Sequence, residues 1–442
     1  MISRNGEGAK GPAISLLRAE VNQRWEEPMS SVKPYSIPKH LVATAYRRVR
    51  ANRGAAGVDG ESIAAFEQGL KDRLYKIWNR MSSGSYFPPP VRLVEIGKKD
   101  GGTRPLGIPT VADRVAQTVV KLVLEPLVEP VFHPDSYGYR PGRSAHDAVA
   151  KARQRCFEFD WVIDLDIKGF FDSIPHEFVE RAVARHTDLA WVRLYVARWL
   201  RAPLHQPDGT VVPRALGTPQ GGVVSPLLAN LFLHYALDAW MQRRYPGVPF
   251  ERYADDVIVH CRSEGEARAV LAAIAERFAA CGLALHPTKT RIVYCKDDNR
   301  PGKAEHVQFD FLGFTFRARP ARGRQGRTFF GFLPAISRSA AQEIRGAIRG
   351  WRLTTKTHLQ WADLVAPLDP VVRGWWAYFG RFYSSATVQA LQQVNRALVR
   401  WVQRKSQRGH RCWRVAVRWL RGLARRAPQS FVLWRLGVLP VG

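Results

Sequence analysis

Apolar and polar residues alternate between residues 161 and 167, as they do in a β-strand with one buried face. One face of this strand is apolar, and the other carries Asp164 and Asp166 beside Val162. The apolar residues 248–250 and 257–259 flank a turn at 253–256, which predicts a strand-turn-strand hairpin. The pattern therefore predicts antiparallel strands with an apolar face against a core and an acidic face toward a cleft.

Other stretches predict helices and connections. Residues 37–100 favour helices followed by a strand, with a glycine turn at 98–102. Ser263 and Glu266 form a capping box before an apolar stripe that ends at Gly282. The segment from Arg317 to Arg327 is dense in Arg, Gly and Pro, which predicts a linker, and a helical segment follows it.

Two adjacent carboxylates, Asp255 and Asp256, lie at the predicted hairpin turn. Like charges repel unless a cation or a proton neutralises them. If Asp166 lies on the neighbouring strand, three carboxylates converge and can hold two Mg²⁺ ions roughly 3.5–4 Å apart, which activate a hydroxyl and stabilise a leaving group. The alternative is a solvated Asp-Asp turn, so the metal hypothesis depends on Asp166 joining the pair.

The charge of the chain is strongly positive, with a formal net charge of +29 and a pI near 10.5. Such a balance implies a polyanionic partner. No acidic residue follows Asp369, and arginines recur there at helical spacing beside an apolar stripe. Single-sign rows of this kind predict phosphate-binding surfaces, whereas the interleaved tryptophans favour core packing. The predicted nucleic-acid-binding residues of this segment are Arg396, Arg400, Arg404, Arg411, Arg414 and Arg418.

An apolar fraction of 46% allows a sizeable core in two or three domains. The chain has no run of 18 or more apolar residues, and its polar first ten residues lack the apolar stretch of a secretory signal. The five cysteines are scattered without a Cys-x-x-Cys pair, which argues against a zinc site and a disulfide framework. A protein of the cell interior, with no membrane partner, is expected.

Nine sequence blocks occur in the order found in one protein family. The blocks are Asn52 to Gly60, Arg104 to Pro109, Tyr139 to Ser144, Asp166 to Asp172, Thr218 to Gly222 with Ser225-Pro226, Tyr253 to Asp256, Pro287 to Thr290, Phe311 to Phe314 and Arg373 to Phe379. Through them the chain resembles, from about Lys33 to about Arg435, the bacterial group II intron-encoded reverse transcriptases and maturases.

The resemblance implies an α+β right-hand polymerase fold with fingers, an antiparallel-sheet palm and an α-helical thumb, or maturase, domain. The expected division is a variable N-terminal extension at 1–36, fingers at 37–154, palm at 155–316, a basic linker at 317–333, thumb at 334–407 and a basic nucleic-acid-binding segment at 408–442. Whether the last segment forms a DNA-binding module or only extends the thumb is left open. Met29 is a candidate start. No endonuclease domain is expected, so insertion would use a pre-existing 3′ end.

By this resemblance the protein is an RNA-directed DNA polymerase that also assists intron splicing. Its expected cofactors are two Mg²⁺ ions and its substrates dNTPs. The expected partners are group II intron RNA and a target DNA or primer, in the bacterial cytoplasm with the nucleoid, and a homodimer is left open. The alternatives are a splicing cofactor without polymerase activity and a reverse transcriptase unconnected to introns.

The family's site residues map onto matching positions of this sequence. Asp166, Asp255 and Asp256 would be catalytic metal ligands, joined by the Ile167 backbone, and Lys289 would donate a proton to pyrophosphate. Asp164 would support these ligands from outside the metal shell. The nucleotide would contact Lys98, Arg104, Lys168, Phe171 and Gln220, with Phe171 excluding a 2′-hydroxyl. Arg140 and Arg143 would bind nucleic acid.

Overall fold

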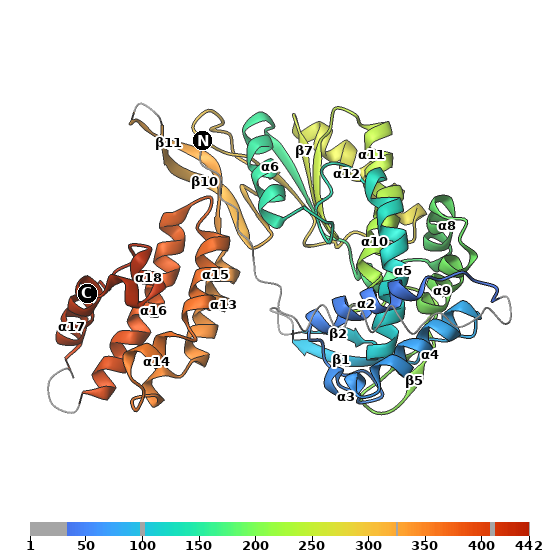
Figure 1. Ribbon diagram of the computed structural model, residues 1–442. Helices are drawn as coiled ribbons and strands as arrows, with labels where there is room; N and C mark the ends of the chain where they lie inside the picture. Colours follow the sequence, from blue (N-terminus) through green and yellow to red (C-terminus); the bar gives the residue numbers. More distant parts are fainter. Residues whose placement is uncertain (1–32, 98–101, 324–325, 407–411, 442) are drawn as a thin grey trace, which may run out of the picture.

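The computed structural model describes residues 33–97, 102–323, 326–406 and 412–441. Figure 1 shows a larger lobe, which holds the N-terminal helices and a central sheet, and a C-terminal lobe of helices drawn in orange to red. The C-terminal lobe comprises residues 337–441. Met29 and most of the predicted N-terminal extension lie outside the described residues.

The larger lobe begins with helices and a β-hairpin, in the order predicted. These elements are α2 (Lys39–Ala51), α3 (Ile63–Glu67), α4 (Leu70–Ser82), β1 (Val91–Gly97), β2 (Thr103–Ile108) and α5 (Val111–Val128). β1 and β2 pair antiparallel, and the short strands β4 (Leu204–His205) and β5 (Val211–Val212) extend their sheet. Residues 98–101 of the predicted turn lie outside the described residues.

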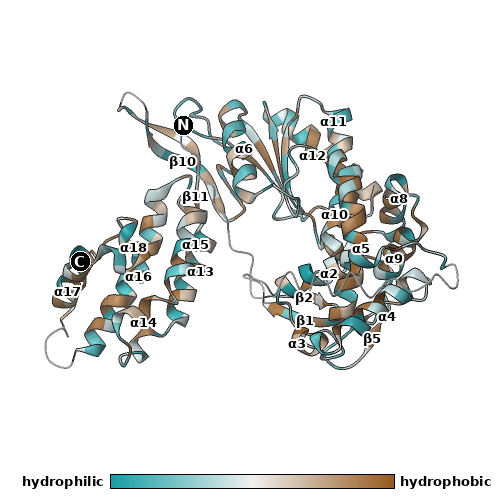
Figure 2. Cartoon of the chain, in the orientation of Figure 1, coloured by the Kyte–Doolittle hydropathy of each residue, from teal (hydrophilic) through white to brown (hydrophobic). Residues whose placement is uncertain are grey.

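Helix α5 is buried along much of its length and organises this end of the lobe. The Thr110 side chain accepts a hydrogen bond from the Asp113 N–H and starts the helix. The buried Asp113 carboxylate accepts hydrogen bonds from Tyr86, Trp199 and Gln117. Burial raises the pKa of Asp113, and these three donors oppose the rise. Figure 2 shows the apolar character of α5 and of the neighbouring α10.

Further helices complete the larger lobe. They are η1 (Glu129–Val131), α6 (Ala145–Glu158), α7 (Phe170–Ser173), α8 (His176–His186), α9 (Ala190–Leu200), α10 (Ser225–Leu233), the π-helical turn η2 (His234–Asp238), α11 (Ala239–Arg244) and α12 (Glu264–Ala280). Of these, α6 and α12 contact the central sheet. The predicted cap of α12 is confirmed, since Ser263 accepts from the Glu266 N–H and Gly282 ends the segment with φ +74°. The Glu266 carboxylate accepts from the N–H of Arg262, whereas a capping box would use the N–H of the next residue, Ser263.

The central sheet has the order β6-β7-β3-β8 and is antiparallel throughout. Its strands are β3 (Trp161–Leu165), β6 (Phe250–Tyr253), β7 (Asp256–Cys261) and β8 (Arg291–Tyr294). The predicted alternation is confirmed, because Ile163, Leu165 and Ile167 enter one core while Val162 enters another beneath α6. The first core also contains the N-terminal helices, so the boundary predicted at residue 154 does not separate two cores.

The predicted linker at 317–333 is wrong. β10 (Phe314–Arg322) and β11 (Thr328–Ile336) form a long antiparallel hairpin through this segment, and β9 (Gln308–Phe311) pairs only with the start of β10. Pro320 pairs opposite Phe330 beyond the end of β9, so its missing N–H faces no further strand. Composition misled the prediction, because proline is tolerated where one edge of a strand is free.

The C-terminal lobe has one core that runs from Ile336 to Val438. Its elements are α13 (Arg338–Gly350), η3 (Leu353–Thr355), α14 (Trp361–Val365), α15 (Asp369–Phe379), α16 (Ser384–Lys405), α17 (Trp413–Arg426), η4 (Pro428–Ser430) and α18 (Val432–Arg435). The Asn395 side chain on α16 accepts a hydrogen bond from Trp434 and donates one to the Val438 carbonyl. The described part of the 408–442 segment therefore completes this core, as in the alternative that the segment extends the preceding helices.

Four of the five cysteines are buried. Cys156, Cys261, Cys281 and Cys295 are free and buried, as expected of packing residues, while Cys412 is exposed. Among the helices within the described ranges, none combines the length and apolar character that crossing a bilayer requires.

Trp434→Ala tests whether α18 is part of the C-terminal core. Trp434 is 2% exposed and stacks on Trp361 with ring centroids 4.7 Å apart. The cavity left by truncation is expected to cost about 3–5 kcal/mol of unfolding free energy, measured by urea denaturation followed by circular dichroism. Arg425→Ala, on the exposed face of α17, is the control. Equal unfolding midpoints for the two variants would show that α18 adds nothing to the lobe.

Candidate active site

The Asp255-Asp256 pair lies at the turn between β6 and β7, as predicted. Tyr253 pairs opposite Asp256, so Ala254 and Asp255 form the two-residue turn. Ala254 has φ +57°, in the left-handed region that residues with a Cβ atom adopt infrequently. The hairpin therefore presents two successive carboxylates at one end of the sheet.

Strand β3 brings the third acidic residue to the same end. Leu165 pairs opposite Val257, and one further step along this register places Asp166 beside Asp256. The pKa of Asp256 is raised to about 7, first by burial and then by the charges of Asp255 and Asp166. The three acidic residues, which come from distant segments, are therefore close enough to interact electrostatically.

Asp164 shares this environment. Burial is the largest cause that raises its pKa to about 7, the charge of Asp256 is the next, and Arg291 opposes them from β8. Protein atoms surround the Asp256 carboxylate on most sides, but its side chain is still exposed to solvent. Excess negative charge thus accumulates at this end of the sheet, and a bound cation would relieve it.

Lys289 lies next to Asp166, with 3.7 Å between its Nζ and the Asp166 Oδ2. Backbone contacts hold the 286–290 turn in this position, since the His286 N–H donates to the Asp166 carbonyl at 2.8 Å. The Thr290 hydroxyl lies 3.3 Å from the same carbonyl. The structure thus brings together the lysine and the acid that the sequence predicted as catalytic.

Across the described residues, no group of three or more His, Cys, Asp and Glu side chains is arranged to hold a metal ion. The available donors nevertheless fit Mg²⁺, because they are carboxylate oxygens and a backbone carbonyl. On one side of this segment, the Asp166 carbonyl accepts from the His286 N–H and the Lys168 N–H donates to the Ala284 carbonyl. The backbone groups of Ile167, which lies opposite Leu285, therefore point to the other side, toward β7.

Phe171 and Gln220 are two of the predicted nucleotide contacts that the structure describes. Phe170 is buried in the core, whereas Phe171 is only half-buried. The Gln220 carbonyl accepts a hydrogen bond of 2.7 Å from the Gly107 N–H. A Cβ atom on Gly221, which has φ +113°, would lie 2.4 Å from the Gly107 oxygen, so glycine permits this close approach. Two sequence blocks that resemble the family thus meet in space.

The remaining basic residues of the predicted nucleotide site are less well defined. Lys168 is exposed beside Gly169, at the start of α7. Lys98 lies outside the described residues, and so does the side chain of Arg104, whose backbone belongs to β2. The predicted contacts of these three residues with a nucleotide remain predictions.

Two parts of the chain match models of known protein families. Residues 96–316 match the family model for reverse transcriptase (RNA-dependent DNA polymerase), which is half of the 442-residue chain. The chain belongs to this reverse transcriptase family. Residues 341–419 of the C-terminal lobe match the maturase-specific domain of group II introns.

Several curated proteins are similar to the reverse transcriptase domain. Protein YkfC of Escherichia coli is 36% identical over 211 residues, which are 46% of this chain and 55% of that protein. The group II intron-encoded protein LtrA of Lactococcus lactis is 33% identical over 213 residues, or 47% of this chain and 35% of LtrA. An uncharacterized 91 kDa protein in the cob intron of Schizosaccharomyces pombe is 32% identical over 210 residues, or 46% of this chain and 25% of that protein. The match thus spans between a quarter and about half of each of these three relatives.

Arg140 of the reverse transcriptase domain has a structural role that the sequence did not indicate. Its guanidinium is buried and donates to Glu129 and to the carbonyls of His133 and Ser136. These bonds leave little of the side chain for a phosphate, so the predicted nucleic-acid contact is not supported. Arg143 is exposed and lies over the Tyr137 ring, and its nucleic-acid contact remains a prediction.

The arginines of the maturase-specific domain divide as the helical spacing predicts. Arg396, Arg400 and Arg404 are exposed on α16, and Leu391 and Leu398 on its other face are buried. Arg414 and Arg418 are exposed on α17, where they line a groove with other arginines. Arg411 lies outside the described residues.

A cleft between α13 and α16 contains basic residues that the sequence prediction missed. It has a volume of about 510 Å³, and Arg345, Arg349 and Arg352 line it opposite Arg400. These three arginines recur at intervals of about one helical turn, a signal that was present in the sequence. The cleft combines arginines from two helices into one basic surface.

Proposed function

We propose that this protein is an RNA-directed DNA polymerase and intron maturase, which binds group II intron RNA, assists its splicing and copies it into DNA at a target site. The observation that carries this proposal is the convergence of Asp166, Asp255 and Asp256 with Lys289 in a domain of the reverse transcriptase family. In this proposal the N-terminal elements act as fingers, the central sheet as palm and the C-terminal lobe as thumb.

The reaction joins the 3′-oxygen of a primer to the α-phosphorus of a dNTP and breaks the bond between that phosphorus and pyrophosphate. Asp166, Asp255, Asp256 and the Ile167 carbonyl are the groups that would hold two Mg²⁺ ions. When bound, these ions supply activation of the 3′-hydroxyl and charge stabilisation of the leaving group. In this proposal Lys289, whose Nζ lies 3.7 Å from the Asp166 Oδ2, donates a proton to the departing pyrophosphate.

Selection of the nucleotide would depend on Phe171. It follows Asp166 by five residues, and its ring packs edge-on against the buried Phe170, with centroids 5.2 Å apart. The Phe171 carbonyl also accepts from the Thr218 N–H at 2.8 Å, which ties this backbone to the segment that contains Gln220. A ring held in this way would clash with a ribose 2′-hydroxyl.

Binding of intron RNA would use the basic surfaces of the C-terminal lobe. From Arg317 to the end of the sequence, the acidic residues are Glu343, Asp363 and Asp369 alone. Asp369 accepts from the Val432 N–H and pairs with Arg435, so it is engaged within the lobe. The arginines of α16, α17 and the α13–α16 cleft would bind phosphates of RNA and of the primer or target DNA.

Primer extension on an RNA template with Mg²⁺ tests the polymerase. Asp255→Asn and Asp256→Asn should each lower the rate by at least about 100-fold while RNA affinity stays unchanged, because a ligand of the metals is lost but no basic surface is altered. Asp188→Asn, an exposed acid away from the site, is the control. Equal extension by all variants would contradict the assigned site, and no extension by the wild type would favour a splicing cofactor.

Phe171→Val tests the selection of the sugar. Removing the ring should raise rNTP incorporation relative to dNTP by at least about tenfold, because steric exclusion of the 2′-hydroxyl is lost. Competition between the two nucleotides in single-nucleotide extension measures this ratio. Phe170→Leu, a core change beside it, should lower stability without changing selection. An unchanged ratio for Phe171→Val would remove its assigned role.

Salt dependence of RNA binding tests the basic cleft. Replacing Arg345, Arg349 and Arg352 together by Gln should reduce the slope of log Kd against log salt concentration by about 2–3, if each arginine contacts one phosphate. The control is the same charge change at the exposed Arg181, Arg185 and Arg193 on α8 and α9. If both triple variants shift the slope equally, binding reflects net charge and not this cleft.

A further inference from the structure

The peptide between Ala254 and Asp255 depends on its surroundings for its conformation. Ala254 has φ +57°, and a residue with a Cβ atom adopts this region only when neighbouring groups determine it. The Ala254 carbonyl belongs to the same peptide group as the Asp255 N–H. The orientation of this peptide group therefore determines the direction in which the Asp255 side chain leaves the backbone.

A buried arginine binds this carbonyl from behind the hairpin. Arg252 is fully buried, and its Nη1 donates to the Ala254 carbonyl at 3.1 Å and to Asn230 Oδ1 at 2.8 Å. Its Nε and Nη2 donate to the two carboxylate oxygens of Asp238 at 2.7 and 2.6 Å. This bidentate geometry fixes the plane of the guanidinium and so the direction of the bond to Ala254.

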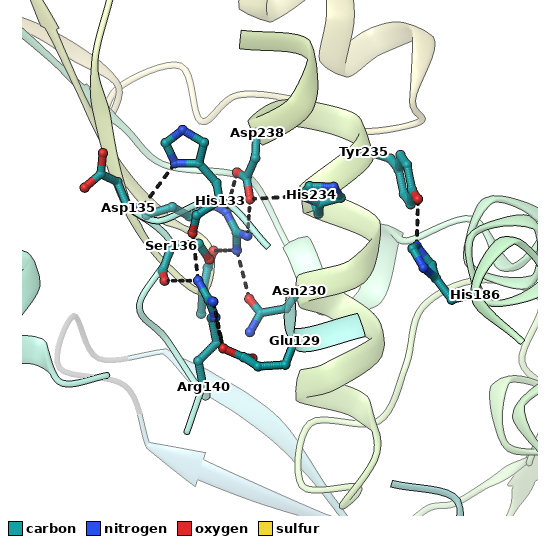
Figure 3. Close-up of polar contacts among 12 residues, drawn as sticks. Glu129, His133, Asp135, Ser136, Arg140, His186, Asn230, His234, Tyr235 and Asp238 are labelled. Atoms are coloured by element: carbon teal, nitrogen blue, oxygen red, sulfur yellow. Dashed lines mark hydrogen bonds and ion pairs between the residues drawn. The ribbon is translucent and has the colours of Figure 1, made fainter. Parts of the chain in front are cut away.

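The position of Asp238 follows from an irregular turn. Asp238 ends the π-helical turn η2, which continues α10, and its side chain is fully buried. A π-helical turn inserts an extra residue into the helix and so changes the direction of the side chains that follow. His234 Nδ1 on the same turn lies 4.0 Å from the Asp238 Oδ2. Figure 3 shows the two side chains pointing toward one another.

The 133–140 loop supports the turn from another side. Asn230 Nδ2 donates to the Gly138 carbonyl at 2.6 Å, and a Cβ atom on Gly138 would lie 2.4 Å from the Ala254 nitrogen. Arg140 holds the loop through bonds of 2.7 Å to the carbonyls of His133 and Ser136 (Figure 3). The loop therefore packs against the peptide that precedes Ala254, while Arg252 binds the carbonyl of the peptide that follows it.

We propose that Arg252, Asp238 and Asn230 are positioning residues for nucleotidyl transfer, which hold the Ala254–Asp255 peptide so that Asp255 and Asp256 can share metal ions with Asp166. The inference rests on the proposed polymerase function. Apolar side chains of similar volume could fill the same space, but they could not bind the Ala254 carbonyl. The buried ion pair thus provides direction as well as packing.

The double variant Arg252→Met with Asp238→Leu separates these two contributions. Replacing both members of a buried ion pair by apolar residues often leaves stability unchanged, so the thermal midpoint should stay near that of the wild type. Mn²⁺ affinity, measured by electron paramagnetic resonance, should fall at least about tenfold, as when groups that orient metal ligands are removed. The kcat of primer extension should fall about 100-fold with little change in KM for dNTP.

The matched control is Arg300→Met with Asp297→Leu. This second pair is also largely buried, and Arg300 donates to the Phe159 carbonyl at 2.9 Å. Within the described chain, Arg300 bonds to Phe159, Asp160 and Asp297, and none of these belongs to the 253–256 turn. Mn²⁺ affinity and kcat should therefore remain those of the wild type.

Asn230→Ala gives a second measurement that keeps the Arg252–Asp238 pair. It removes one bond to Arg252 and one to the Gly138 carbonyl, and it should also weaken Mn²⁺ binding. Folded variants of either kind with wild-type Mn²⁺ affinity would overturn the proposal. A wild type that binds Mn²⁺ but extends no primer would instead refute the polymerase function, and the comparison of Mn²⁺ affinities would still decide this inference.

Discussion

The antiparallel pairing of β3 with β7 holds the acidic residues of this protein together. Ile163 and Leu165 fill the core on one face of the sheet, while Asp164 lies on the other face beside the Asp256 carboxylate. A register slip of one residue would turn Asp164 into that core and move Ile163 and Leu165 to the face that carries the acidic residues. The cost of such a slip fixes the register, and the register in turn sets which carboxylates meet.

Buried polar groups complete what apolar packing begins. Arg155 on α6 donates to Glu251 at 2.5 Å and to Asp135 at 2.7 Å, and Glu251 also accepts from His260. The Asp135 carbonyl accepts from the Arg252 N–H, so the 133–138 loop lies along β6 almost as a further strand. Because hydrogen bonds have direction and apolar contacts do not, these networks specify the position of the catalytic hairpin more narrowly than packing alone.

Arginine serves two opposite purposes in this chain. Arg252 and Arg140 are buried and donate hydrogen bonds to carboxylates and carbonyls inside the reverse transcriptase domain. Arg349 and Arg400 face the cleft of the C-terminal lobe, where phosphates could reach them. The net charge of +29 counts both kinds equally, so the charge indicates a polyanionic partner without locating its binding surface.

The sequence by itself determined the features that depend on neighbours in the chain. The alternation at 161–167, the hairpin at 253–256 and the apolar stripe of α16 were predictable because local periodicity sets them. Tertiary structure decided the rest. The 317–333 hairpin, the burial of Arg140 and the support of Ala254 by residues of α10 and η2 had no local signal. Each depends on which distant segment lies opposite, and only the folded chain brings those segments into contact.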